Sequence, residues 1–265
     1  MKHSFQGYYF KHQNGDQTLC LIVGRSDSGR FLQIITNEFS KKIPFPEGVE
    51  LTRKGISLSV KEPGLTLSGR IRYGRKSPIR YDIMGPFCLI PMECRHGIIS
   101  MEHRLKGKVS LNGTVMDFTG GKGYMEMDSG RSFPSAYAWI QANDFKIPCS
   151  IMASAAVIPF LGLHFRGCIC IIHYRGREYR LATYLGARIL ACSRENMVLE
   201  QGKYRLEIQV DGTEGHRLRA PQNGRMSRTI LETPSCPAKF SFYEKRRLVF
   251  RLRSRHASYE WEGNF

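Results

Sequence analysis

Residues 120–145 read GGKGYMEMDSGRSFPSAYAWIQANDF, a run in which acids, aromatic rings and amides alternate with small or apolar side chains. In an extended strand, successive side chains point to opposite faces. Tyr124, Glu126 and Asp128 therefore share one face of a first strand, and a glycine and a proline after them mark a turn region. The run predicts two neighbouring β-strands that present polar and aromatic groups to one space.

The second strand of this run carries a mixed face of its own. Tyr137, Trp139, Gln141 and Asn143 alternate with alanine and isoleucine. Ordinary barrel packing would account for the two rings, but an apolar core would not account for the two amides. This face is therefore predicted to be wet or lined by a ligand.

The remainder of the chain reads as short strands separated by turn residues, with few windows of helical period. Asn112-Gly113 is the strongest two-residue hairpin signal. Hairpins are predicted within residues 19–35, 56–73, 109–118, 168–184, 198–210 and 240–252. Strands at this spacing indicate an all-β barrel or sandwich, and they are too many for one barrel of about eight strands. We expect two barrel-like lobes in tandem, residues 1–130 and 131–265, although the sequence shows no clear internal repeat.

The charge balance is strongly basic. The 265 residues include 40 Lys and Arg against 23 Asp and Glu, a net charge of +17, while 42% hydrophobic content allows real cores. Arg247, Arg251, Arg253 and Arg255 alternate with apolar residues, as in a strand with an apolar inner and a basic outer face. This face fits a solvated barrel exterior or docking on anionic lipid, and nucleic acid is the partner that fits least.

Other segments bear on location and class. The first residues have no signal-peptide or transit pattern, so we expect a cytoplasmic protein, with or without a peripheral contact with membrane. The eight cysteines include no Cys-x-x-Cys pair, which favours packed thiols in a reduced core over a zinc ribbon or a thioredoxin-like site. Residues 147–165 approach the roughly 20 apolar residues of a spanning helix. Two prolines and a glycine interrupt that run, so a buried strand and turn are predicted.

Glu126 and Asp128 are the main candidates for acid–base chemistry. Two carboxyl groups that lie close together drive one pKa upward, which would keep one of them protonated. The alternative is a salt-bridged or hydrogen-bonded pair that anchors the strand to Lys122, Arg131 or backbone amides. The sequence leaves both interpretations open.

Residues 92–103, MECRHGIISMEH, add Glu93 and His96. The spacing of this segment is not that of a recognised zinc motif, so no metal site is predicted. We expect Glu93 and His96 to form a hydrogen bond, either as a proton donor tuned near neutrality or as a structural contact at the mouth of a barrel. Dinucleotide, P-loop and nucleophile-elbow signatures are missing.

The motifs GYMEMD, SFP and YAWIQANDF in residues 123–145 resemble the signature of the tocopherol cyclase family: Gly-aromatic-x-Glu-x-Asp/Asn, Phe-Pro and Trp-x-Gln-x-Asn. The likeness covers nearly the whole chain. It continues through GYYFK at residues 7–11, GPF at 85–87, MECRHG at 92–97, ATYLGA at 182–187, LRAP at 218–221 and GRM at 224–226.

The resemblance implies paired lipocalin-like domains, as in the related carotenoid hydratase family, with a cavity for an apolar ligand. It also implies a cofactor-free ring closure by an intramolecular lyase or isomerase. A proton is delivered to an alkene of a prenyl tail, and a phenolic oxygen of the quinol head attacks the resulting cation. The reaction needs a protonated acid in an apolar pocket, aromatic faces for the cation and a base or amide near the phenol. The acid candidates are Glu126, Asp128, Glu93 and His96, and the ligand-binding candidates are Tyr124, Phe133, Tyr137, Trp139, Gln141 and Asn143.

Two other functions remain open at this stage. A non-catalytic lipocalin-like carrier of a hydrophobic ligand would need only the cavity, and replacing Glu93, Glu126 or Asp128 would leave binding intact. A basic β-module that docks on anionic membrane or nucleic acid would lose binding steeply with salt and would be insensitive to cavity-filling mutations.

Overall fold

The computed structural model describes residues 4–52, 54–160, 162–212, 214–263 and 265, and most of these lie in strands or tight turns. The first ten strands are β1 Phe5–Asn14, β2 Gln17–Ser26, β3 Gly29–Thr36, β4 Ser40–Pro44, β5 Val49–Thr52, β6 Gly55–Glu62, β7 Leu65–Tyr73, β8 Cys94–Leu111, β9 Thr114–Asp117 and β10 Lys122–Gly130. They form one sheet in the order β4-β3-β2-β1-β10-β8-β7-β6-β5, with β9 paired to β8. We call this sheet and its core the first lobe.

The second lobe repeats this plan with the other ten strands. These are β11 Tyr137–Ala142, β12 Cys149–Phe160, β13 Leu163–Tyr174, β14 Arg177–Ala182, β15 Arg188–Cys192, β16 Asn196–Gln201, β17 Tyr204–Val210, β18 His216–Gln222, β19 Arg225–Glu244 and β20 Arg247–Glu262. Their order is β14-β13-β12-β11-β20-β19-β17-β16-β15, with β18 paired to β19. In each lobe the last strand pairs with the first, β10 with β1 and β20 with β11.

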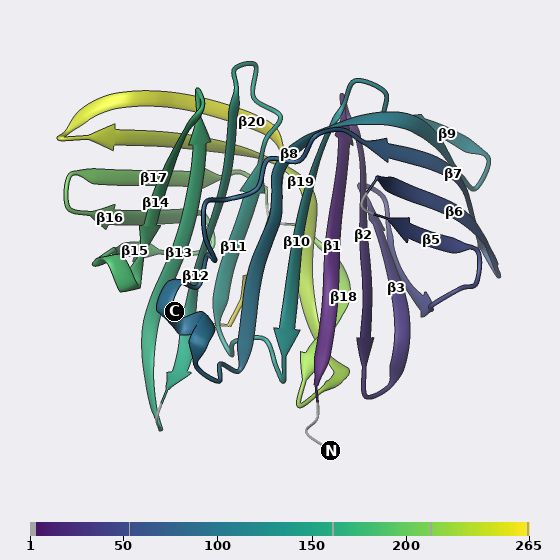
Figure 1. Cartoon of the computed structure of the whole chain (residues 1–265), viewed down its shortest axis with the longest axis horizontal. Coiled ribbons are helices and arrows are strands. Elements are labelled where there is room, and N and C mark those ends of the chain that lie inside the picture. The colour runs from purple at the N-terminus through teal and green to yellow at the C-terminus, as the bar shows by residue number, and fades with distance from the viewer. Residues whose placement is uncertain (1–3, 53, 161, 213, 264) are drawn as a thin grey trace.

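The two sheets curve strongly and stand side by side, as Figure 1 shows. The prediction of an all-β protein with two lipocalin-like lobes is thus confirmed. Among the described residues, helical structure is limited to two short 3-10 turns, η1 Gly85–Leu89 and η2 Thr183–Leu185.

Local sequence explains the strands and their turns. In β6, buried Ile56, Leu58 and Val60 alternate with more exposed residues, as expected where one face of a sheet covers a core. The β8–β9 turn has φ of 50° at Asn112 and 87° at Gly113, the left-handed conformation that a two-residue hairpin requires. The other predicted hairpins also form.

The strands also place the uncharged run at residues 147–165 and the arginine-rich strand near the C-terminus. The uncharged run at residues 147–165 supplies β12 and the turn into β13, and no helix in the described part of the chain is long and apolar enough to cross a membrane. On β20, Arg247, Arg251, Arg253 and Arg255 are exposed as predicted. Leu248, expected on the inner face, lies next to the β19–β20 turn and is 49% exposed.

Buried apolar residues form three clusters. One fills the first lobe around residues such as Leu19, Leu67 and Phe118, and a second fills the second lobe around Ile151 and Phe240. The third lies between the lobes, and its members come from both sheets: Tyr9, Cys20, Ile35, Ile83, Met84, Met101, Tyr124, Tyr137, Trp139, Met152, Ile171, Leu218, Ala220 and Ile230. The two lobes therefore share an apolar interface.

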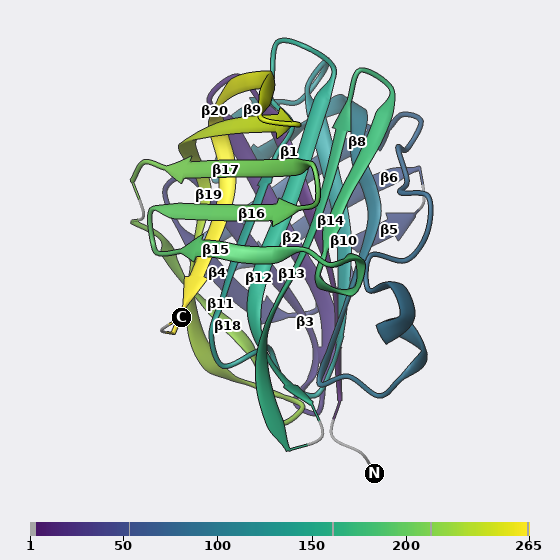
Figure 2. The same ribbon diagram turned by 90° about the vertical axis from the view of Figure 1, so that its left-hand side faces the viewer.

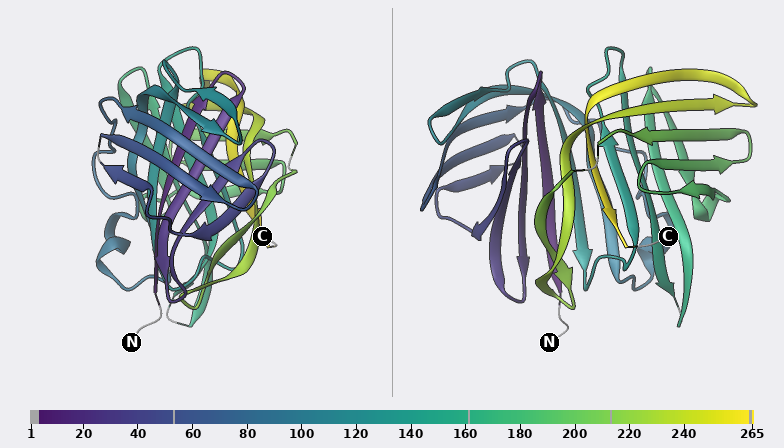
Figure 3. Two further views of the ribbon diagram at one scale, coloured as in Figure 1. Left: turned by 90° about the vertical axis from the view of Figure 1, so that its right-hand side faces the viewer. Right: turned by 180° about the vertical axis from the view of Figure 1, so that it is seen from behind.

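Hydrogen bonds cross the same interface. The side chain of Gln33 in β3 donates to the backbone carbonyl of Arg219 in β18 at 3.1 Å and accepts from the amide of Arg219 at 3.0 Å. The ammonium group of Lys122 donates to the carbonyl of Asn143 at 2.7 Å. β18 and β19 lie against β4 and β2, and the view from behind in Figure 3 shows this part of the chain beside β1.

Residues 74–93, which join β7 to β8 and which we call the strap, leave the first lobe and lie on the second. The guanidinium group of Arg180 in β14 donates to the carbonyls of Asp82 at 2.9 Å and Tyr81 at 2.8 Å. The hydroxyl of Tyr184 donates to the carbonyl of Ile83 at 3.0 Å. In Figure 1 the strap's helix η1 lies in front of β12 and β13, and in Figure 2 it stands at the edge of the molecule beside the same sheet. The strap thus closes one side of the interface between the lobes.

Candidate functional site

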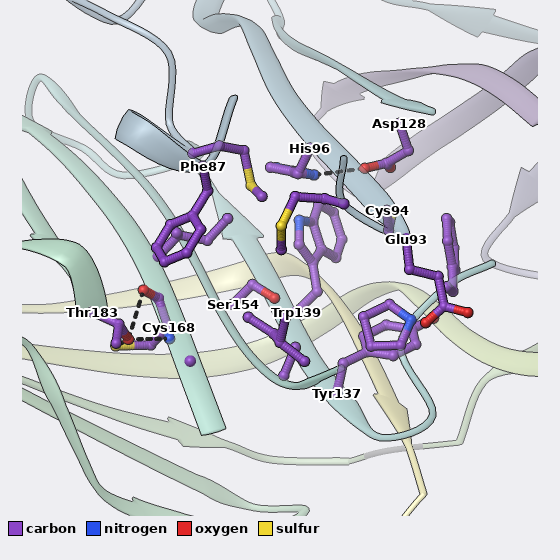
Figure 4. Close-up of a pocket in the computed structure, with 18 of the residues that line it drawn as sticks. Phe87, Glu93, Cys94, His96, Asp128, Tyr137, Trp139, Ser154, Cys168 and Thr183 are labelled. Atoms are coloured by element: carbon purple, nitrogen blue, oxygen red, sulfur yellow. Dashed lines mark hydrogen bonds and ion pairs between the residues drawn. The ribbon is translucent and has the colours of Figure 1, made fainter. Parts of the chain in front are cut away.

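A cavity lies between the lobes under the strap. Most of its lining is apolar or aromatic: Met84, Phe87, Met92, Phe133, Pro134, Trp139, Ala156, Ile158, Pro159, Phe165 and Ile169. Its ionisable lining groups include His96 on β8, Glu126 and Asp128 on β10 and Glu260 on β20. Figure 4 shows His96 and Asp128 on one side of the cavity and Cys168 with Thr183 on the opposite side.

Glu126 brings a buried carboxyl group to this cavity. The residue is 5% exposed, and the hydroxyl of Tyr124, two residues earlier on the same strand face, donates to Oε2 at 2.6 Å. Burial raises the pKa of the Glu126 carboxyl well above its usual range; the charge of Asp128 adds to this rise, while His96 and the Tyr124 hydroxyl oppose it. Glu126 is therefore a carboxylic acid, rather than a carboxylate, near neutral pH.

His96 lies between two carboxyl groups. Its Nδ1 is 2.9 Å from Oδ1 of Asp128, its cross-strand partner, and its Nε2 is 3.5 Å from Oε2 of Glu126. Burial opposes the charged imidazolium, but the negative charge and the hydrogen bond of Asp128, together with the charge that Glu126 carries once it ionises, outweigh burial and raise the pKa of His96 to about 9. The ring is thus a cation at neutral pH, paired with the Asp128 carboxylate.

Ligand atoms of His96, Glu126 and Asp128 lie within 4.8 Å of one another, a spacing that a divalent ion could bridge. Each imidazole nitrogen, however, faces a different carboxyl group. An ion bound through one ring nitrogen would have one carboxyl group on its own side of the ring and the other carboxyl group against the far nitrogen. The charged imidazolium supplies between the two acids the positive charge that a metal ion would bring, so the arrangement favours proton transfer.

A second acid, Glu260 on β20, lines the same cavity from the other lobe. The hydroxyl of Tyr137 donates to its Oε2 at 2.6 Å. Burial raises the pKa of Glu260 well above its usual range, against the Tyr137 hydrogen bond, and the negative charges of Glu126 and Asp128 raise it further. The cavity thus holds one weak acid from each lobe.

Aromatic rings pack around these acids. Trp139 is 5.5 Å from Tyr9 and 6.4 Å from Tyr124 between ring centroids, and Phe133 is 5.9 Å from Tyr137. The indole Nε1 of Trp139 is buried and has no hydrogen-bond partner among the described residues. It can therefore donate to an oxygen atom of a ligand.

The structure brings together most of the predicted site residues. Those that line the cavity are Glu93, His96, Glu126, Asp128, Phe133, Tyr137 and Trp139. Tyr124 is fully buried behind Glu126 and acts through its hydrogen bond. The expected contact between Glu93 and His96 is replaced by the His96–Asp128 bond, because Asp128 is the cross-strand neighbour of His96.

The two predicted amide side chains, Asn143 and Gln141, do not line the cavity. Asn143 is 1% exposed and donates to the carbonyls of Gly123 at 3.1 Å and Met101 at 3.5 Å, so it ties the lobes together rather than lining the cavity. Gln141 is fully buried beside Ser258, its partner in β20, and neither polar atom of its side chain has a partner in the part of the chain described. Its strand face is polar, as expected, but Gln141 itself is not among the residues that line the cavity.

Glu260 and the apolar residues of the strap were not among the predicted site residues. A signal for Glu260 exists in hindsight, since Glu260-x-Glu262 near the end of the second lobe repeats Glu126-x-Asp128 near the end of the first. Phe87 belongs to the GPF motif of the family resemblance, but neither Phe87 nor Met84 was a predicted site residue, because only the path of the strap across to the second lobe places them over the acids.

Comparisons with known proteins agree with this architecture. A family model described as tocopherol cyclase-like matches residues 66–263. No curated protein matches the chain significantly. Kievitone hydratase from Nectria haematococca superposes with a TM-score of 0.55 at 11% identity, covering 98% of this chain and 88% of that one. CghA, crystallised with Sch210972, gives a TM-score of 0.63 at 8% identity, covering 98% of this chain and 89% of that one. At these identities the similar structures establish the fold alone.

Proposed function

The chain belongs to the tocopherol cyclase-like family, and from this premise we propose that it catalyses ring closure on a prenylated quinol or a similar isoprenoid by acid catalysis, without a cofactor. The observation that carries the proposal is Glu126, a protonated carboxyl group in a cavity lined by apolar and aromatic residues. Protonation of an alkene needs an acid of this kind in a site that excludes water.

The surroundings of Glu126 suit a proton donor. Tyr124 donates to Oε2, which leaves the other carboxyl oxygen to carry the proton. Once the proton has gone to the alkene, the hydrogen bond from Tyr124 and the imidazolium of His96 stabilise the carboxylate that remains. Asp128 in turn holds His96 in its charged form.

The cavity walls suit the carbocation that protonation creates. The faces of Trp139, Tyr137 and Phe133 can stabilise a positive charge, as aromatic rings do for other cations. The apolar side chains of the strap keep water away, so that the cation is captured by the ligand's own hydroxyl group. An oxygen of the quinol head can accept a hydrogen bond from Nε1 of Trp139.

The test is turnover of a prenylated quinol in deuterated water. Ring closure by this route places one deuterium on the former alkene carbon of each product molecule. We expect Glu126→Gln to lower the rate by about 100-fold or more, in line with the usual contribution of a general acid, and to leave ligand binding intact. Glu262→Gln is the matched control, because Glu262 is paired with Arg228 outside the cavity. Products without deuterium, or full activity in Glu126→Gln, would refute this mechanism.

A carrier of a hydrophobic ligand is the alternative function. It is favoured by the apolar lining, and CghA, a protein of similar structure, was crystallised with Sch210972. Organic extraction of the protein purified from its own host separates the two functions. A prenylated quinol or the corresponding ring-closed product supports the cyclase, whereas an unrelated lipid that binds equally to the wild type and Glu126→Gln, with no turnover, supports a carrier.

A peripheral contact with anionic membrane also remains a proposal. It is supported by the exposed row of Arg247, Arg251, Arg253 and Arg255 along β20 and by the net charge of +17. Binding to vesicles that contain anionic lipid should fall as salt rises, and Arg251→Glu with Arg253→Glu should weaken it further. Equal retention on neutral vesicles would argue against this contact.

A further inference from the structure

Glu260 is not alone on its side of the cavity. Glu232 on β19 is its direct cross-strand partner, so the two side chains lie on one face of the sheet. Directly opposite residues on antiparallel strands have Cβ atoms about 4.5–5.5 Å apart. Trp139 is the partner of Glu260 on the other side, in β11. The row Trp139, Glu260, Glu232 therefore runs from the cavity wall into the interface between the lobes.

Glu232 is fully buried, and only one of its two carboxyl oxygens has a hydrogen-bond partner among the described residues. The hydroxyl of Tyr9, from the first lobe, donates to Oε1 at 2.8 Å, while Oε2 has no hydrogen-bond partner within the described residues. The nearby ammonium group of Lys11 donates to the carbonyl of His256. A buried carboxyl group with a free oxygen beside a second carboxyl group is unusual for a purely structural pair, because native side chains normally satisfy such atoms.

The two lobes place their acids in equivalent positions. Glu126 and Asp128 lie on β10 and Glu260 and Glu262 lie on β20, the last strand of each lobe, which pairs with that lobe's first strand. In each pair the first acid accepts a tyrosine hydroxyl at 2.6 Å. The second acid of each pair is held by a base from the same lobe, Asp128 by His96 and Glu262 by Arg228.

From this duplication and from the position of Glu232 we propose that Glu260, backed by Glu232, is a second acid–base residue of the site and accepts the proton that the attacking hydroxyl group releases. The inference rests on the proposed function and supplies the base that ring closure requires. In this scheme the proton donor, Glu126, belongs to the first lobe, and the proton acceptor, Glu260, belongs to the second lobe.

The proton balance of the reaction is then complete. The O–H bond of Glu126 breaks and a C–H bond forms at the alkene, which leaves a tertiary cation and the Glu126 carboxylate. A lone pair of the ligand's hydroxyl oxygen forms the C–O bond, and the proton of that hydroxyl passes to Glu260. The two carboxyl groups have exchanged protonation states, and the proton returns from Glu260 to Glu126 when product leaves and water enters.

The acceptor must be able to hold a single negative charge before the reaction. Two carboxyl groups that face each other cannot both ionise without strong repulsion, so Glu232 keeps its proton and Glu260 is the one of the two that ionises. The reaction therefore starts from the form of the site in which Glu126 is protonated and Glu260 is ionised. The titratable groups around Glu260 are Tyr137, Glu126, Asp128, Glu262 and its cross-strand partner Glu232, and those around Glu232 are Glu260, Tyr9 and Lys11. Burial raises the pKa of both carboxyl groups.

The first experiment needs no ligand. In protein labelled with 13C at the glutamate carboxyl groups, NMR follows the titration of Glu232 in the wild type and in Glu260→Gln. The charge of Glu260 raises the pKa of Glu232, so removing it should lower the apparent pKa of Glu232 by about one unit or more, whereas Glu262→Gln, which removes the acid paired with Arg228, should leave it nearly unchanged. If Glu260→Gln does not fold, Glu260→Ala serves instead. An unchanged Glu232 titration overturns the pairing.

The second experiment measures turnover of the quinol in deuterated water. Glu260→Gln should bind the ligand normally and lower turnover by about 100-fold or more. Full activity in Glu260→Gln, with Glu126→Gln inactive, would overturn the acceptor role and leave the proposed function standing. Absence of turnover in the wild type would overturn the acceptor role together with the proposed function, while the titration would still report whether the two acids are coupled.

Discussion

At the scale of single residues, the surroundings of each acid decide its protonation state. Glu126 and Asp128 are two positions apart on one strand, yet Asp128 is paired directly with the His96 cation while Glu126 is buried behind a tyrosine hydroxyl. Burial therefore sets the direction of the pKa shift at Glu126, whereas the charges of neighbouring acids set the direction of the pKa shift at His96. Two carboxyl groups on one strand face can in this way take different roles.

The raised pKa of Glu126 makes a prediction about stability. In the unfolded chain Glu126 ionises near its usual pKa, whereas the folded protein holds it protonated to higher pH, so the wild type loses stability as pH rises between those two values. Glu126→Gln should therefore match the wild type near pH 4 and become more stable above it, by about 1.4 kcal/mol per pH unit. Urea unfolding at several pH values measures this difference. The exposed Glu50→Gln is the control, and a difference that does not grow with pH would contradict the assignment.

The charge on His96 makes a second prediction. Asp128 is the largest of the influences that raise the pKa of this ring, and burial acts in the opposite direction. Asp128→Asn should thus bring the pKa of His96 down from about 9 by at least ~1 unit, and NMR of the imidazole signals can follow it. Asp117→Asn, on the exposed β9, should have no effect. An unmoved His96 titration would show that another group holds the charge.

At the scale of elements, the strap determines access to the cavity. It contributes Met84, Phe87 and Met92 to the lining, and it is attached to the second lobe through Arg180, Tyr184 and Glu178. The guanidinium group of Arg180 also lies 3.6 Å from the ring centroid of Tyr81. One side chain thus joins a connection of the first lobe to a strand of the second.

Arg180→Lys should loosen the strap while leaving the sheets intact. A lysine keeps the charge but cannot form the forked contacts to Tyr81 and Asp82. We expect proteolysis within residues 74–84 to be about tenfold faster, which corresponds to roughly 1.4 kcal/mol in the opening equilibrium. Arg177→Lys, at the exposed start of the same strand, is the matched control. Equal cleavage of both variants and the wild type would show that other contacts hold the strap.

At the scale of the whole molecule, the lobes depend on each other. The third cluster draws its residues from both sheets, and polar groups of β1 reach across it, Tyr9 to Glu232 and Lys11 to the carbonyl of His256. Neither lobe could expose this face to water without leaving large apolar surface uncovered. The site exists only where the two lobes meet.

Tyr9→Phe tests this dependence. The change removes the hydrogen bond to Oε1 of Glu232 and leaves that buried carboxyl group without its one bonded partner. We expect a loss of about 1–3 kcal/mol in the free energy of unfolding, in a single transition shared by both lobes. Tyr8→Phe is the control, because Tyr8 lies on the opposite face of β1 and is exposed. Two separate transitions, or a loss no larger than that of Tyr8→Phe, would show that the lobes are coupled only weakly here.

The sequence by itself determined the strands, the turns and the candidate acids of the first lobe. Alternation of side chains places Tyr124, Glu126 and Asp128 on one face, and Asn112-Gly113 requires a turn, because both depend only on backbone geometry within a few residues. The resemblance to a family added the paired lobes as lipocalin-like domains. Most of the predicted site residues do line one cavity.

Only the tertiary structure decided which groups meet. The partner of His96 depends on the register of β8 against β10, and register follows from the packing of whole strands rather than from local spacing. Glu260 pairs with Glu232 across two neighbouring strands. Glu232 in turn accepts a hydrogen bond from Tyr9, which lies more than a hundred positions away along the chain. Burial also arises only when the lobes close over these groups. The sequence could therefore name the acids of the first lobe, but their protonation, their partners and the second acid followed from the folded interface.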